Sequence, residues 1–355
     1  MSEGTTRLPV SVLTGFLGSG KTTLLNRVLQ DPAMSETAVI VNEFGEIGID
    51  HALVEKASDD VILMASGCLC CTVRGELLET LDNLAFRREK GEVPPFRRIL
   101  VETTGLADPA PIMQGLIYDM GMMDMFQIGP VVTMVDAVHG EQALREHREA
   151  VKQVAIADRL VLSKTDLAER NAVSRLTSRL RALNPGAPLF EAKLGTIAPD
   201  KLFGGGGFEL DDKISEVRDW IDTEARAHGH HHAHDHSHDH GDHDHEQAHE
   251  ELDRNRHDDR IRAVCLTFDQ PLDFPSTMEW LERISAEHGE NVLRVKGLLN
   301  VTGKDVPLVI HGVHYLHHPP VTLAAWPDQD RRSRLVFILR DLDRAVLEPG
   351  MPKQQ

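Results

Sequence analysis

Short apolar runs alternate with helix-patterned stretches over the first 200 residues. Continuous apolar runs of the length expected for buried strands occupy residues 9–14, 37–41, 61–64, 98–101, 129–135 and 159–162. Stretches with helical patterning separate most of these runs, for example residues 75–89 and 172–183. Strands that alternate with helices form right-handed crossovers, so the pattern predicts an α/β doubly wound domain with a mainly parallel sheet.

The pattern changes near residue 203. Four consecutive glycines at 204–207 open a stretch that later carries 11 of the 20 histidines between residues 228 and 249. Such a composition cannot build a core, so we predict a flexible linker over 204–260. After residue 260, segments with strand patterns stand before and after one segment with a helical pattern. This order predicts a small C-terminal α+β domain. The predicted parts are an α/β domain at 1–203, the linker at 204–260 and the α+β domain at 261–355.

Charge and cysteine usage narrow the classes of function. The chain of 355 residues has a formal net charge of −18, which argues against a nucleic-acid or anionic-membrane surface. It has no apolar run near the roughly 20 residues that span a bilayer, and residues 1–7 lack a signal-peptide pattern. We therefore expect a cytoplasmic protein with no nucleic-acid or membrane partner, whose four cysteines remain reduced.

The segment after the first apolar run matches the P-loop pattern, Gly-x-x-x-x-Gly-Lys-Thr. Its glycines allow the backbone N–H groups to surround phosphate oxygens, Lys21 adds a charge for the β and γ phosphates, and Thr22 is suited to bind Mg²⁺. A merely flexible turn would explain the glycines but not the Lys-Thr pair. The residues expected to bind nucleotide are Gly15, Gly18, Ser19, Gly20, Lys21, Thr22 and Thr23.

Two further segments fit a nucleotide site. Glu102 ends an apolar run and would act on Mg²⁺ or its waters, and Gly105 could approach the γ-phosphate through its amide. Ser163, Lys164 and Asp166 fit the guanine-reading loop of GTPases, since a carboxylate can accept from the two adjacent N–H donors of guanine. Adenine lacks that pair of donors, so Asp166 favours GTP. The first position is usually Asn, and a simple helix cap is the alternative explanation of this segment.

Three cysteines, Cys68, Cys70 and Cys71, follow Gly67 within four residues. Thiolates are soft ligands that suit Zn²⁺ or Cu(I), and three of them leave one tetrahedral position open for a carboxylate, a water or an incoming ligand. This arrangement favours transfer of a metal over permanent storage. The alternatives are small buried side chains and a redox role, although the spacing is not Cys-x-x-Cys.

Together, these motifs and the His-rich segment resemble the CobW-type family of metallochaperone GTPases. The resemblance covers almost the whole chain and implies GTP hydrolysis, with Lys21 and Glu102 in catalytic roles. It also implies zinc binding by Cys68, Cys70 and Cys71, a switch segment containing Glu43 near Mg²⁺ or Zn²⁺, and metal-requiring client proteins. The alternative functions are insertion of cobalt or another metal, buffering or sensing of zinc, and signalling by a GTPase that has a structural zinc. A homodimer is also left open.

Overall fold

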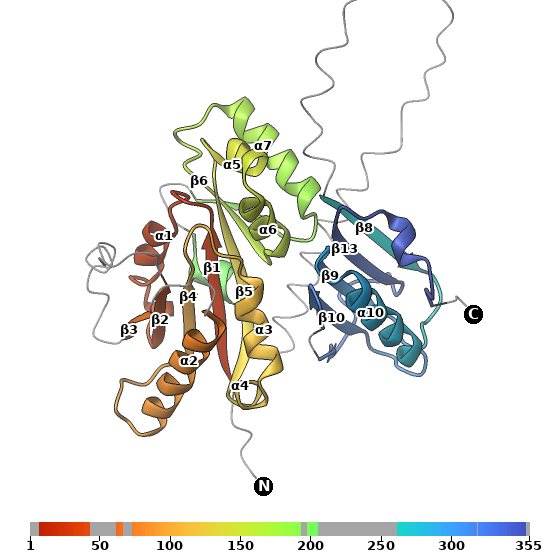
Figure 1. Ribbon diagram of the computed structural model, residues 1–355, viewed down its shortest axis with the longest axis horizontal. Helices are drawn as coiled ribbons and strands as arrows, with labels where there is room; N and C mark the ends of the chain where they lie inside the picture. The colour runs from red at the N-terminus through yellow and green to blue at the C-terminus, as the bar shows by residue number, and fades with distance from the viewer. Residues whose placement is uncertain are drawn as a thin grey trace, which may run out of the picture.

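The computed structural model describes residues 7–42, 62–66, 73–192, 197–204, 261–317 and 319–352. These residues form two separate sheets, which lie side by side in the molecule (Figure 1). We call residues 8–203 the α/β unit and residues 261–352 the C-terminal unit. No helix in the described ranges is both long and apolar enough to cross a bilayer.

The sheet of the α/β unit has seven strands in the order β3-β2-β4-β1-β5-β6-β7, and every neighbouring pair is parallel. Parallel pairing places the carboxyl ends of all the strands at one edge of the sheet, where α/β proteins bind their ligands. The strands are β1 (Leu8–Gly15), β2 (Thr37–Asn42), β3 (Ile62–Ser66), β4 (Arg98–Glu102), β5 (Phe126–Asp136), β6 (Arg159–Ser163) and β7 (Leu189–Glu191).

Helices cover both faces of this sheet, which explains the continuous apolar runs (Figure 1). On β1, Val10 and Val12 pack toward α2 and α3, whereas Leu13 packs on the opposite face against α1 and α8. The helices of the unit are α1 (Lys21–Val28), α2 (Val73–Glu89), α3 (Ala110–Tyr118), α4 (Met120–Met125), α5 (Gly140–Glu146), α6 (Arg148–Ile156), α7 (Arg170–Leu183) and α8 (Pro199–Phe203). The predicted fold class is confirmed.

The C-terminal unit is an antiparallel sheet with one long helix, α10 (Phe274–His288). Trp280 of this helix is buried and meets Phe268 and Phe337 edge to face, and its indole N–H donates to the Leu347 carbonyl at 2.8 Å. The strands are β8 (Ile261–Phe268), β9 (Val292–Leu299), β10 (Leu308–Val313), β11 (Leu316–His317), β12 (Val321–Thr322) and β13 (Ser333–Arg340), in the order β11-β10-β9-β13-β8 with β12 beside β10.

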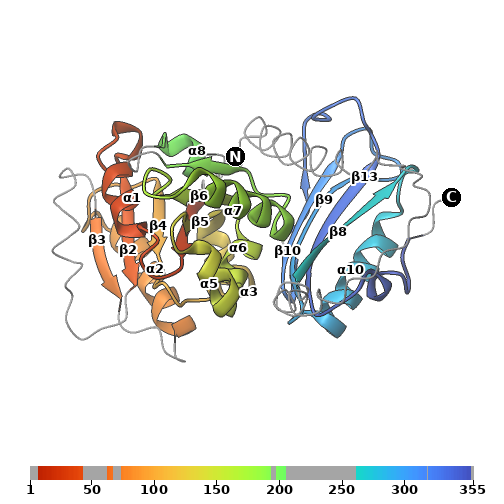
Figure 2. The ribbon, with the colours of Figure 1, turned by 90° about the horizontal axis from the view of Figure 1, so that it is seen from above.

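The face of this sheet opposite α10 meets the α/β unit (Figure 2). Arg294 of β9 donates to the Ile156 carbonyl at 2.6 Å and forms an ion pair with Asp158, which also lies 3.1 Å from the Lys296 ammonium. Burial alone would raise the pKa of Asp158, but Arg294, Lys296 and the Val131 amide outweigh burial and hold the pKa below its usual value. The two units are therefore joined at the end of α6 by an ion pair between the buried Arg294 and the half-buried Asp158.

Replacing Arg294 by Met should lower the free energy of unfolding by about 1.5–3 kcal/mol, because Asp158 loses a charged hydrogen-bond donor and keeps Lys296 as its other cationic partner. The matched control is Arg262→Met. Arg262 pairs with Asp343 at the surface, with side chains 48% and 73% exposed, so we expect a loss of less than about 1 kcal/mol. Urea unfolding followed by circular dichroism measures both. Equal losses in the two variants would contradict this description of the interface.

Candidate functional site

The P-loop joins the end of β1 to the start of α1 and depends on glycine at two positions. Gly15 has φ +142°, and a Cβ atom there would lie 2.4 Å from the Met134 carbonyl oxygen. Gly20 has φ +93° and is the N-cap of α1. The Lys21 ammonium donates to the carbonyl of Gly15 at 2.9 Å, so its charge is held over the loop that the sequence predicts to bind phosphate.

A hydroxyl and a carboxylate meet beside this loop. Strand β4 pairs with β1 in a register that sets Glu102 opposite Leu13, which brings Glu102 to the first turn of α1. The Thr22 hydroxyl donates to Glu102 Oε1 at 2.9 Å, and Glu102 is only 5% exposed. Hydroxyl and carboxylate oxygens are the hard ligands that Mg²⁺ prefers, so this pair fits the magnesium role predicted for both residues.

The loop after Glu102 packs directly on the P-loop and is held from α6. A Cβ atom at Gly105 would lie 2.6 Å from the Leu17 backbone nitrogen, so only glycine permits this approach. The Gln153 amide of α6, which is fully buried, donates to the carbonyls of Gly105 at 3.1 Å and Ala107 at 2.9 Å. Helix α6 therefore fixes the position of the glycine that is predicted to approach the γ-phosphate.

The predicted guanine-reading loop is attached to the P-loop by two side chains. The buried Ser163 hydroxyl donates to the Ser19 carbonyl at 2.7 Å, and the Lys164 ammonium donates to the Gly18 carbonyl at 2.7 Å. Asp166 is exposed at the end of this loop. Although Ser163 stands where Asn is usual, its hydroxyl still connects the two loops, and the structure thus brings the predicted phosphate and base segments together.

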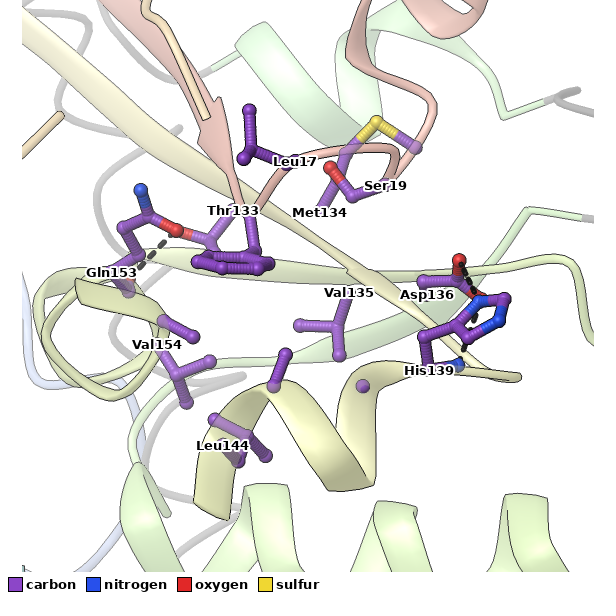
Figure 3. Close-up of a pocket in the computed structure, with 14 residues that line it drawn as sticks. Leu17, Ser19, Thr133, Met134, Val135, Asp136, His139, Leu144, Gln153 and Val154 are labelled. Carbon is purple, nitrogen blue, oxygen red and sulfur yellow. Dashed lines mark hydrogen bonds and ion pairs between the residues drawn. The ribbon is translucent and has the colours of Figure 1, made fainter. Parts of the chain in front are cut away.

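Asp136 is a site residue that the sequence analysis missed. It ends β5, is 7% exposed, accepts from the Val138 amide at 2.7 Å and lies 3.1 Å from His139 Nδ1 (Figure 3). The Lys164 ammonium lies 2.6 Å from Oδ2, the oxygen that also faces His139, whereas the Val138 amide donates to Oδ1. Burial would raise the pKa of Asp136, but Lys164 and the Val138 amide outweigh it and lower the pKa. A carboxylate at the end of an apolar run was the available signal, as it was for Glu102.

The three motif cysteines and Glu43 lie outside the described residues, but the strands that lead to them are described. Strand β3 ends at Ser66, which pairs with Asn42 at the end of β2. Both ends lie at the same sheet edge as Glu102, and Cys68 follows Ser66 by two residues.

Two histidines of the C-terminal unit have structural partners. The His314 ring is buried and its Nδ1 lies 3.0 Å from the Gly289 carbonyl, while His317 Nε2 lies 2.7 Å from the Ser285 hydroxyl. Burial lowers the pKa of both rings, so the neutral form is favoured in the folded chain.

The chain matches two family models and resembles proteins of known class over nearly its full length. Residues 9–191 match the CobW/HypB/UreG nucleotide-binding domain, and residues 261–352 match the C-terminal domain of the cobalamin synthesis protein cobW. It is 31% identical to the zinc chaperone YjiA of Escherichia coli over 93% of each chain. It is 30% identical to the zinc chaperone CobW of Pseudomonas aeruginosa, over 96% of this chain and 90% of that one.

Solved structures agree with this assignment. The crystal structure of the Zn(II)-bound YjiA GTPase from Escherichia coli superimposes with a TM-score of 0.66 at 27% identity, covering 97% of this chain and 98% of that one. The match includes both units and the P-loop that connects β1 to α1. The chain therefore belongs to the CobW family of P-loop GTPases, enzymes that hydrolyse GTP to GDP and phosphate.

Proposed function

We propose that this chain is a GTP-dependent zinc metallochaperone that binds Zn²⁺ at Cys68, Cys70 and Cys71 and releases it to client proteins when GTP is hydrolysed. The observation that carries the proposal is the common sheet edge. The strand that leads to the cysteines, β3, ends at the same edge as the Thr22–Glu102 pair, with only β2 between β3 and β4. The full-length relatives named zinc chaperones support zinc as the cargo.

The nucleotide roles follow from the donors that each segment offers. Lys21 would turn from the Gly15 carbonyl to the β and γ phosphates, and the backbone amides from Gly15 to Thr23 would surround their oxygens. Thr22 and Glu102 would hold Mg²⁺, which when bound neutralises negative charge on the phosphates. Asp166 would accept from guanine. Ser163 and Lys164 would keep Asp166 at a fixed distance from the phosphate loop.

Coupling to zinc requires that the metal bind the two nucleotide states with different affinity. Adjacent parallel strands lie about 4.8 Å apart, so the ends of β3 and β4 are about 10 Å apart across β2. Strand β2 lies between these strands and ends at Asn42, the residue before the predicted switch residue Glu43. A γ-phosphate that orders the switch segment would bring the Glu43 carboxylate toward the thiolates. Hydrolysis would then weaken the zinc site.

Asp166→Asn should weaken GTP binding by about 30- to 100-fold, because the carboxylate is replaced by an amide that cannot accept from both guanine N–H groups. The same variant should gain affinity for xanthosine triphosphate, since the amide N–H can donate to the second xanthine carbonyl. Titration with fluorescent nucleotides measures both affinities. Asp200→Asn, at an exposed position in α8, is the control. Unchanged GTP affinity in Asp166→Asn would rule out the assigned base loop.

Ser163→Ala should weaken GTP binding by about fivefold, because one buried hydrogen bond of about 1 kcal/mol between the base loop and the P-loop is lost. Ser178→Ala is the matched control, since the Ser178 hydroxyl donates to a carbonyl within α7, away from the nucleotide loops. Isothermal titration with GDP and with a GTP analogue provides the affinities. If the two alanine variants bind equally well, the hydroxyl contributes nothing to the site.

Zinc affinity should differ by about tenfold or more between the chain saturated with GDP and the chain saturated with a non-hydrolysable GTP analogue. Competition with a chromophoric chelator measures it. The difference should disappear in Cys68→Ser/Cys70→Ser/Cys71→Ser, because the coupled ligands are gone. Cys265→Ser is the matched control. Cys265, in β8 of the C-terminal unit, makes no disulfide.

Imidazoles of the His-rich segment at 228–249 would also bind zinc in this assay, so the triple serine variant defines the background to be subtracted. Transfer of zinc to a metal-free client protein in the presence of GTP distinguishes a chaperone from a zinc buffer, because a buffer does not pass its metal to a client. Equal zinc affinities in the two nucleotide states would refute the proposal, and a nucleotide-dependent affinity without transfer would leave the chain a sensor.

A further inference from the structure

A groove between the two units is lined by cations and apolar side chains in about equal number, although the chain is strongly acidic. Its volume is about 390 Å³, and its walls come from α5, α6 and α7 on one side and from the C-terminal sheet on the other. The cationic side chains that line it are Arg145, Arg148, Lys152 and Arg340, together with His147. Glu146 is the single acidic residue of the lining. The whole chain, in contrast, has 56 acidic and 38 basic residues.

Two of these cations have no ion-pair partner in the part of the chain that the structure describes. Arg145 and Arg148 are exposed, and neither forms an ion pair within the described residues. The Arg340 guanidinium donates to the Glu290 backbone carbonyl at 3.0 Å and pairs with no carboxylate among the described residues. The groove therefore keeps positive charge available to a ligand, whereas the arginines of the unit interface and the surface pairs are neutralised by carboxylates.

Apolar side chains lie between the cations. Leu144, Val151, Leu183 and Ile261 contribute to the lining. A small inorganic anion would use the charges but not this apolar surface. A peptide with both acidic and aliphatic side chains would use both.

The groove wall is also part of the nucleotide site's support. The His147 ring stacks on the Phe16 ring of the P-loop with centroids 4.5 Å apart. The Lys152 ammonium lies 3.0 Å from Asp108, in the loop that follows Gly105. A carboxylate entering the groove would reach Lys152 beside Asp108, so an occupant contacts residues that hold both nucleotide loops.

We infer that this interunit groove is the docking site for an acidic, partly aliphatic segment of a client protein. Naming the partner a client rests on the proposed chaperone function, whereas the binding chemistry rests only on the groove. The unpaired charges of Arg145 and Arg148, next to apolar surface, select carboxylate-bearing peptides over neutral ones. Because both arginines are exposed, the attraction should weaken with added salt.

Fluorescence anisotropy tests the inference on the full-length, metal-free chain saturated with GDP, so that the P-loop is already filled. The probe is a fluorescein-labelled ten-residue peptide of six glutamates and four leucines. We expect it to bind, to bind more weakly as salt rises from about 50 to about 300 mM, and to lose about tenfold or more in affinity in Arg145→Glu/Arg148→Glu. The milder Arg145→Gln/Arg148→Gln variant should lose less.

Arg170→Glu/Arg175→Glu is the matched control, because both arginines are exposed on α7 and neither lines the groove. Equal weakening in this control would overturn the inference, as would equal binding of the peptide with glutamine in place of glutamate. Displacement of the probe by tripolyphosphate at equal charge would also overturn it, since the site would then be a simple anion site.

A last variant addresses the chain's own acidic stretch. Residues 228–260 carry a net charge of −7, and they precede Ile261 of the groove. If the probe binds only after the acidic residues of this stretch are changed to amides, the groove belongs to that stretch and the inference is wrong. The assay contains neither zinc nor GTP, so its result does not depend on nucleotide-coupled zinc release.

Discussion

Parallel pairing of β4 with β1 is the constraint on which the nucleotide site depends. The register that sets Glu102 opposite Leu13 brings a carboxylate to the first turn of α1, where Thr22 donates to it. The same direction of all seven strands places the ends of β2 and β3 at that edge. A sheet with one reversed strand in this region would separate Thr22 and Glu102, the predicted magnesium ligands, from the strand that leads to the cysteines.

Helix α6 connects this edge to the C-terminal unit. Its Gln153 holds the carbonyls of Gly105 and Ala107, and its last residue, Ile156, accepts from Arg294 of β9. A single short helix is thus fixed at one face to the loop that would sense the γ-phosphate and at its end to the other unit. Helix α6 is therefore in direct contact with both the loop after Glu102 and the C-terminal unit.

Much of the fold could be read from the sequence because apolar runs buried on both faces leave a strong local signal. The runs at 98–101 and 159–162 correspond to β4 and β6, and the helical pattern at 75–89 falls within α2. The three-residue strand β7 and the short helices α4 and α8 were not predicted. Their patterns are too short for periodicity to be distinguished from a loop, and tertiary packing decides them.

The site was predictable where chemistry fixes sequence spacing. Glycines followed by Lys21 and Thr22 predict a P-loop. The structure brings Glu102 and Ser163 to that loop. Gln153 and Asp136 escaped prediction because they act through backbone carbonyls and other side chains rather than through a motif. Such contacts link residues 28 to 48 positions apart, and only the folded chain brings them together.

The central claim is that cleavage of the γ-phosphate and release of zinc are one event. Single-turnover mixing of the zinc-loaded chain with GTP and a fluorescent zinc indicator, alongside a phosphate sensor, measures both in the same solution. The account predicts that zinc and phosphate appear with the same rate constant, and that both slow together in Thr22→Ala. Zinc that leaves at an identical rate with GDP, or before any phosphate is formed, would contradict it.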